Sequence, residues 1–127
     1  WVYVPERRFV FHRYAWLSNY GDDYSPGHSG LIAEITLPPN AESDLEKLEH
    51  KTVEGLVELG VIKDECVELV RSWYHKYAYP IYTLTHSQDV QTVNQFSSGL
   101  NIRNFGRWGQ WQYWNTDKIF EASNTLL

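Results

Sequence analysis

The residues best suited to chemistry lie close together in the sequence, between positions 104 and 120. This segment contains three tryptophans, one tyrosine, two glycines and one arginine, and it is too polar to be plain core. Arg107 can hold an anion through two parallel hydrogen bonds. Gly106 and Gly109 allow the backbone to approach a ligand closely or to adopt a positive φ. The segment therefore predicts a ligand-binding surface with aromatic walls.

The end of this segment predicts the start of a helix. Asn115, Thr116 and Asp117 are all residue types that cap helix N-termini well. The first backbone N–H groups of a helix have no partner within the helix, and the helix dipole adds positive potential at that end. We therefore expect this helix to face electron-rich ligand atoms.

A second arginine lies within an apolar strand. If residues 9–17 form a strand, Arg13 shares one face with apolar side chains, because side chains alternate along a strand. A charge in such a place is costly unless an anion pairs with it. The residues leave two interpretations open, an ordinary salt bridge or a bound ligand anion. Glu34 lies in the next predicted strand, where it could meet an arginine in a structural pair.

The elements that must position these residues follow from hydrophobic periodicity and turn residues. Ser43 and Glu46 have the spacing of a capping box, and Gly60 is well placed to end the helix that they begin. The pattern predicts an α+β fold, mainly an antiparallel sheet with two amphipathic helices and a C-terminal helix. The expected strands cover residues 1–5, 9–17, 31–37, 65–77 and 101–105, the helices cover 43–60, 87–98 and the region after 115, and a loop covers 18–30.

Length, composition and charge limit the class of protein. The 127 residues suit a single domain, residues 1–127, with one core. Net charge is −5 and the basic residues are scattered, which argues against nucleic acid as a partner. No apolar run is long enough to span a membrane. The lone Cys66 favours a reducing, cytoplasmic location. The five histidines lack metal-ligand spacing, so we expect no metal site.

The chain contains no methionine and begins with the bulky Trp1. An initiator methionine is normally removed only before a small residue, so we expect residues 1–127 to be a piece of a longer protein. A missing part would leave surface exposed on this piece, and exposed surface of that kind favours self-association. We therefore expect the isolated piece to form a homodimer.

Four elements in order carry a resemblance to a known family. They are Trp1-Val-Tyr-Val-Pro-Glu, Phe11-His-Arg followed by Ser18-Asn-Tyr, Ala78-Tyr-Pro, and Gly106-Arg-Trp-Gly-x-Trp-x-Tyr followed by Asn115-x-Asp. Together they resemble the C-terminal part of flavoproteins of the UDP-galactopyranose mutase type. These belong to the wider FAD-dependent amine oxidase and protoporphyrinogen oxidase-like superfamily.

The resemblance implies two sets of site residues in this chain. Arginines and tyrosines at matching positions would hold the pyrophosphate of a nucleotide sugar, and glycines and the start of the last helix would lie against the flavin. The implied substrate-binding residues are Tyr3, Arg13, Tyr20, Tyr79, Arg107 and Tyr113. The implied FAD-contacting residues are Gly106, Arg107, Gly109, Asn115, Thr116 and Asp117.

The resemblance also implies an activity for the parent protein. Reduced FAD would supply the nucleophile for interconverting galactopyranose and galactofuranose without net oxidation, while the arginines stabilise the departing UDP. The FAD-binding βαβ part with its glycine-rich fingerprint is absent from these residues. We therefore expect that part to be a partner of this piece, and the piece alone to bind FAD weakly and to be inactive.

Two other functions stay open. Residues 26–34 and 78–82 look more like amine oxidase-like relatives than like the best-known mutases, so the parent could be an FAD-dependent oxidoreductase. Alternatively, the chain is a stand-alone, non-enzymatic module that binds a ligand or another protein through its aromatic face. The substrate is not fixed by these residues.

Overall fold

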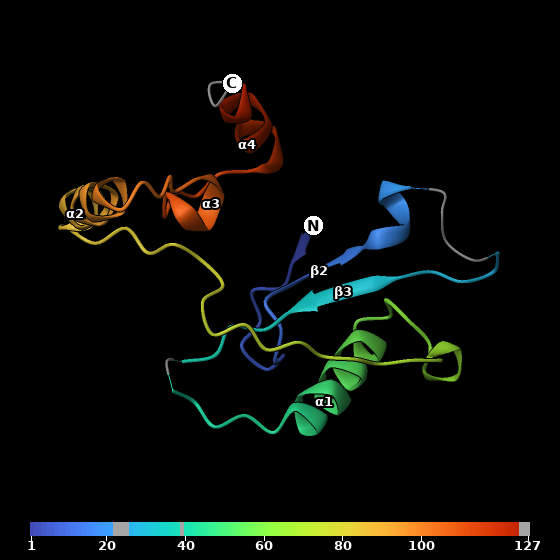
Figure 1. Ribbon diagram of the computed structural model, residues 1–127. Helices are drawn as coiled ribbons and strands as arrows, with labels where there is room; N and C mark the ends of the chain where they lie inside the picture. The colour runs from blue at the N-terminus through green and yellow to red at the C-terminus, as the bar shows by residue number, and fades with distance from the viewer. Residues whose placement is uncertain (22–25, 39, 125–127) are drawn as a thin grey trace. The chain divides into compact units, whose positions relative to one another are not determined.

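The computed structural model describes residues 1–21, 26–38 and 40–124. Part of the expected loop over 18–30 therefore lies outside the described residues, namely 22–25, as does residue 39. The chain forms two compact units, Trp1–Trp73 and Tyr74–Leu127, a division that the sequence did not predict. We call them the N-terminal unit and the C-terminal unit. Figure 1 shows the elements of both along the chain.

The N-terminal unit contains a small antiparallel sheet with the strand order β1-β2-β3. The strands are β1 (Val2–Tyr3), β2 (Arg13–Trp16) and β3 (Leu31–Glu34). A 3-10 turn, η1 (Leu17–Tyr20), follows β2 directly. The predicted hairpin and third strand are confirmed, although each strand is shorter than its predicted range.

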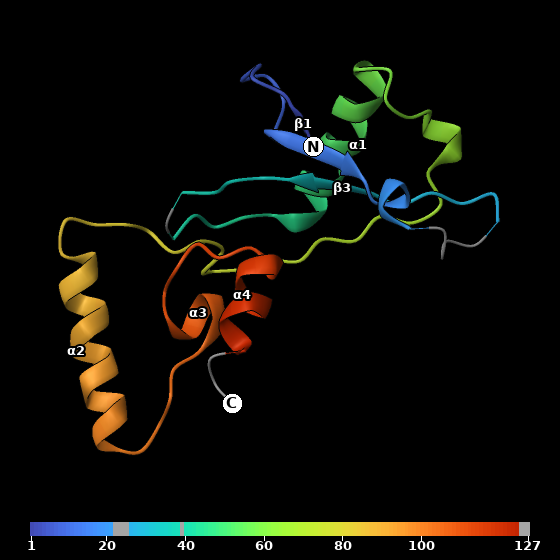
Figure 2. The same cartoon turned by 90° about the horizontal axis from the view of Figure 1, so that it is seen from above.

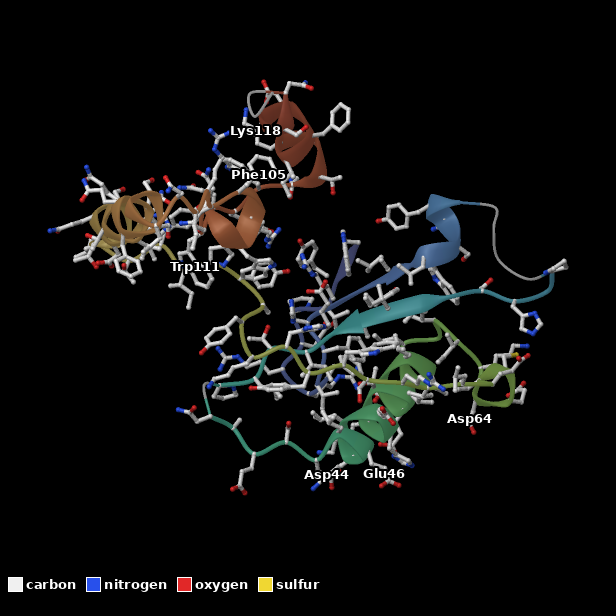
Figure 3. All side chains as sticks on the ribbon, viewed as in Figure 1. Asp44, Glu46, Asp64, Phe105, Trp111 and Lys118 are labelled. Atoms are coloured by element: carbon white, nitrogen blue, oxygen red, sulfur yellow. The ribbon has the colours of Figure 1, made fainter. Side chains whose placement is uncertain are left out.

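Helix α1 (Leu45–Glu58) follows the sheet, and the structure corrects how it begins. The carboxylate of Asp44 accepts a hydrogen bond from the backbone N–H of Lys47 at 3.1 Å, so Asp44 is the N-cap and the predicted Ser43 cap is wrong. Figure 3 shows Asp44 at the beginning of this helix. Gly60 ends it as predicted, with φ 69° and a backbone N–H bonded to the carbonyl of Val57.

The core of the N-terminal unit lies between the sheet and α1, which covers one face of it in Figure 1. Phe11 is the most deeply buried large side chain, with 1% of its surface exposed, and it packs in one cluster with Val4 and Leu56. Its ring stacks on Phe9 with the ring centroids 5.7 Å apart. Gly55 of α1 faces these two rings at a point where no side chain would fit.

Replacing Gly55 by alanine should destabilise the N-terminal unit by up to about 2 kcal/mol. A Cβ at this position would lie 2.9 Å from ring atoms of both Phe9 and Phe11. The overpacking costs about 1–3 kcal/mol, and the better helix propensity of alanine offsets about 1 kcal/mol of it. Urea unfolding followed by circular dichroism measures the change.

The matched control is Gly99→Ala. Gly99 is also helical, but an added Cβ there meets nothing within 4 Å. The substitution should therefore stabilise its helix by up to about 1 kcal/mol. Effects of the same sign at the two glycines would contradict the packing described for Gly55.

The predicted strand over residues 65–77 is wrong. A 3-10 turn, η2 (Asp64–Cys66), occupies its beginning, and residues 67–77 form no helix or strand. Leu69 and Trp73 are more than 70% exposed. A strand needs a neighbour to pair its N–H and C=O groups, and no strand of the described chain pairs with this segment. Alternating β-prone residues were therefore not sufficient evidence for a strand.

The C-terminal unit contains three helices in succession, α2 (His86–Gly99), α3 (Gly106–Gly109) and α4 (Thr116–Ser123), shown from above in Figure 2. The predicted helices over 87–98 and after 115 are confirmed, whereas the short α3 was not foreseen. The predicted strand over 101–105 is wrong. Asn101 has φ 59° there, and it closes the end of α2 through a hydrogen bond to the carbonyl of Ser98.

The interior of the C-terminal unit is polar. Spacing in the sequence predicted Val93 and either Phe96 or Ser97 on the inward face of α2. Ser97 is buried, whereas Val93 and Phe96 are more than half exposed. The Asn104 side chain joins the connection before α3 to α2, since its amide donates to Asn94 and to Ser97 at 3.0 Å each. Hydrogen bonds therefore position α3 where an apolar core would be expected.

The fold class is α+β with a small antiparallel sheet, as predicted from the sequence. Within residues 1–21, 26–38 and 40–124, no helix has the length and apolar character needed to cross a membrane.

Candidate functional site

Three of the residues predicted to bind substrate meet in the C-terminal unit. The guanidinium carbon of Arg107 lies 4.4 Å from the ring centroid of Tyr113 and 5.3 Å from that of Tyr79. The two tyrosine rings stack on each other, with centroids 5.6 Å apart and planes 15° from parallel. Tyr79 precedes the three helices, Arg107 lies in α3, and Tyr113 follows α3. The fold therefore brings together side chains that are distant in sequence.

The guanidinium of Arg107 has unused capacity to donate hydrogen bonds. Its Nη1 donates to the carbonyl oxygen of Trp114 at 3.3 Å, while its Nε is buried without a hydrogen-bond partner. No carboxylate in the described ranges forms an ion pair with Arg107. An arginine presents five N–H donors in one plane, and a buried donor without a partner is unfavourable. Because Nε is buried, an external anion would have to accept from the Nη groups, of which Nη1 already donates to Trp114.

Lys118 in the same unit is a useful contrast. Its ammonium group donates to the carboxylate of Glu121 at 2.6 Å, within α4. This hydrogen bond, together with the charge of Glu121, raises the pKa of Lys118. Lys118 thus has an anionic partner inside the chain, which makes Arg107 the better candidate for an external anion.

The second predicted arginine lies in a row of cross-strand neighbours on the sheet. The strand register places Tyr3 opposite Arg13, and Arg13 opposite Glu34. The Nη2 atom of Arg13 lies 2.7 Å from a Glu34 carboxylate oxygen, and its Nη1 donates to the Tyr3 hydroxyl at 3.2 Å. The Trp1 ring centroid lies 4.4 Å from the guanidinium carbon. The prediction that Glu34 meets an arginine is therefore confirmed.

This ion pair changes what Arg13 can do. Both side chains are largely buried, with 16% and 26% of their surfaces exposed, so Glu34 already supplies the negative charge that the apolar face requires. Binding of a pyrophosphate by Arg13 stays a prediction from the resemblance. Tyr20, the remaining predicted tyrosine, is 70% exposed at the end of η1 in this same unit.

The residues predicted to contact a flavin differ in how open they are. Gly106 has φ 82°, and a Cβ added there would meet nothing within 4 Å. Asn115 is the N-cap of α4, but its side chain makes no capping hydrogen bond. Asn115, Thr116 and Asp117 are all exposed. The contact of Gly106 and the start of α4 with a flavin stays a prediction.

Gly109 serves a contact within the chain. A Cβ at this position would lie 3.4 Å from the backbone carbon of Asn104. A side chain here would therefore be in van der Waals contact with the backbone at Asn104. Its predicted role toward a flavin stays a prediction.

Two residues beside this site did not emerge from the sequence. The hydroxyl of Tyr82 accepts a hydrogen bond from the backbone N–H of Tyr113 at 2.7 Å, and His86 Nε2 lies 2.8 Å from the carbonyl oxygen of Trp111. His86 is buried, with 7% of its surface exposed. The sequence pattern that could have indicated these two residues is a tyrosine and a histidine four residues apart near a helix start. That pattern is too common to identify a binding site.

No group of three or more His, Cys, Asp or Glu side chains in the part of the chain that the structure describes is arranged to hold a metal ion. Comparison with protein-family models, with curated proteins and with solved structures gives no match for this chain.

Proposed function

We propose that this chain binds the pyrophosphate of a nucleotide sugar at Arg107, Tyr79 and Tyr113, as part of a UDP-galactopyranose mutase-like flavoenzyme. The observation that carries the proposal is the half-buried guanidinium of Arg107, which lies beside two stacked tyrosines and has no carboxylate partner in the described residues. The resemblance in sequence implies six residues for the same ligand, and these three are among them.

The chemistry of the three side chains suits this ligand. A pyrophosphate carries about two negative charges, and a planar guanidinium is the best protein partner for it because two N–H groups donate in parallel. Tyrosine hydroxyls add neutral donors that orient the group without adding charge. In the reaction, Arg107 stabilises the charge that develops on the departing UDP, and the tyrosines keep it in place.

We place FAD at Gly106 and the first turn of α4, beside the pyrophosphate site. The open backbone of Gly106 and the exposed N-cap of α4 support this position. When bound, reduced FAD would supply the nucleophile for the anomeric carbon of the sugar, and the N-terminus of α4 would favour negative charge on it. A separate FAD-binding part completes the enzyme.

The exposed, unpaired thiol of Cys66 supports a reducing, cytoplasmic location.

Titration of the chain with three ligands tests the binding proposal. The Trp108 ring centroid lies 5.8 Å from the Arg107 guanidinium carbon, so tryptophan fluorescence should report occupancy. We expect UDP-galactose and UDP to bind, and uridine, which lacks phosphate, to bind at least about tenfold more weakly, because charge-assisted hydrogen bonds are the strong ones. Equal affinity for UDP and uridine would contradict a pyrophosphate site.

A turnover assay on the full-length protein that contains this chain, with FAD supplied, separates the remaining functions. A mutase converts UDP-galactofuranose to the pyranose form after dithionite reduction, whereas an oxidoreductase reduces its flavin with substrate alone. A stand-alone binding module binds UDP and does neither.

A further inference from the structure

Tyr82 and His86 hold three consecutive residues next to the Arg107 site. His86 Nε2 lies 2.8 Å from the carbonyl oxygen of Trp111. The Tyr82 hydroxyl donates to the side-chain carbonyl oxygen of Gln112 at 3.2 Å and accepts from the backbone N–H of Tyr113 at 2.7 Å. The Tyr82 and His86 rings also contact each other, with centroids 4.4 Å apart. The segment 111–113 is thus attached at each of its residues.

The attached segment is under backbone strain. Trp111 has φ 48°, the left-handed region that suits glycine and is unfavourable for a bulky residue. It occupies the position after α3 where a glycine usually ends a helix, with its N–H bonded to the Trp108 carbonyl and the Gln112 N–H bonded to the Arg107 carbonyl. Strained backbone persists where surrounding contacts hold it. The hydrogen bonds from Tyr82 and His86 are such contacts.

We propose that Tyr82 and His86 are positioning residues that fix Tyr113 against Tyr79 and thereby keep the Arg107 site in its binding geometry. The inference rests on the proposed function for its consequence in ligand binding. Two contacts connect Tyr82 to the site. The Tyr82 hydroxyl holds the Tyr113 backbone N–H, and the Tyr113 ring centroid lies 4.4 Å from the Arg107 guanidinium carbon. Neither Tyr82 nor His86 needs to touch the ligand.

The test is Tyr82→Phe, measured by amide hydrogen exchange and by UDP titration. Phenylalanine keeps the ring contact with His86 but removes both hydroxyl hydrogen bonds. The Tyr113 amide should exchange roughly fivefold faster, and UDP affinity should fall roughly fivefold, the fold-change expected for one hydrogen bond. The exchange of α2 amides should stay unchanged, whereas general destabilisation would accelerate those too. His86→Ala should also speed exchange at Tyr113, because Trp111 and the Tyr82 ring both lose their support.

Tyr77→Phe is the control, since Tyr77 belongs to the same unit and is 67% exposed. It should change neither readout. Exchange at Tyr113 that is the same in Tyr82→Phe as in Tyr77→Phe would overturn the positioning role. If the unsubstituted chain fails to bind UDP, the proposed function fails instead, and the exchange rates still decide whether Tyr82 holds Tyr113.

Discussion

Replacement of Phe11 by alanine should lower the free energy of unfolding of the N-terminal unit by about 3–5 kcal/mol. Phe11 is 1% exposed, and it links the sheet to α1 through contacts with Phe9, Tyr14 and Leu56. The lost burial and the cavity that remains both contribute to this cost. A loss of this size is a large part of the stability of a small domain.

Urea unfolding followed by hydrogen exchange of the β2 and α1 amides measures this effect where it arises. Phe120→Ala is the matched control, because Phe120 lies on α4 with 73% of its surface exposed. Its substitution should change stability by no more than about 0.5 kcal/mol. Similar losses for the two phenylalanines would contradict the core described for the N-terminal unit.

The second large effect concerns ligand binding. Arg107→Ala should weaken UDP binding about 10- to 100-fold, because hydrogen bonds to charged groups contribute about 1.5–3 kcal/mol each. Arg107→Lys should recover only part of the affinity, since lysine keeps the charge but lacks the planar pair of donors. Isothermal titration calorimetry measures both constants.

Arg103→Ala provides the comparison for Arg107. Arg103 has the same charge, lies in the same unit and is exposed. Removing the Arg103 charge changes the general electrostatic potential but leaves the stacked Tyr79 and Tyr113 rings in place. UDP affinity should therefore fall by less than about threefold. Equal losses at Arg103 and Arg107 would indicate a general charge effect in place of a specific site.

Local patterns in the sequence predicted three of the four α-helices and the three strands of the sheet in the described residues. Helical spacing predicted α1 and α2, and cap residue types predicted α4. These signals succeed because each depends on residues within a few positions of one another. The predicted N-cap was Ser43, but the observed N-cap is Asp44. Serine and aspartate cap helices about equally well, so residue type alone does not decide which of two neighbours is the N-cap.

Strand assignments failed where the partner was distant or absent. Residues 65–77 have β-prone side chains, yet no strand among the described residues pairs with them. Strand formation depends on pairing and burial more than on intrinsic preference. The division into two units was likewise not visible in the sequence, because the polar interior around Asn104 has no hydrophobic periodicity.

For the site, the sequence could select residue types but not their partners. The resemblance implied six residues for the pyrophosphate, and three of them, Tyr79, Arg107 and Tyr113, are in contact. The other three belong to the N-terminal unit. Sequence alone left open whether Arg13 pairs with a ligand or with the protein, and the strand register places Glu34 opposite it. Register depends on turn geometry and packing across strands, so the side-chain pairs it creates are difficult to read in advance.

The affinities of UDP and UMP for the unsubstituted chain and for Arg107→Ala test most directly whether Arg107 binds a pyrophosphate. UMP lacks the second phosphate and is otherwise the same ligand. The unsubstituted chain should prefer UDP over UMP at least about tenfold, the effect of roughly one charge-assisted hydrogen bond. In Arg107→Ala this preference should fall to near one. A preference for UDP that survives the loss of Arg107 would contradict the site.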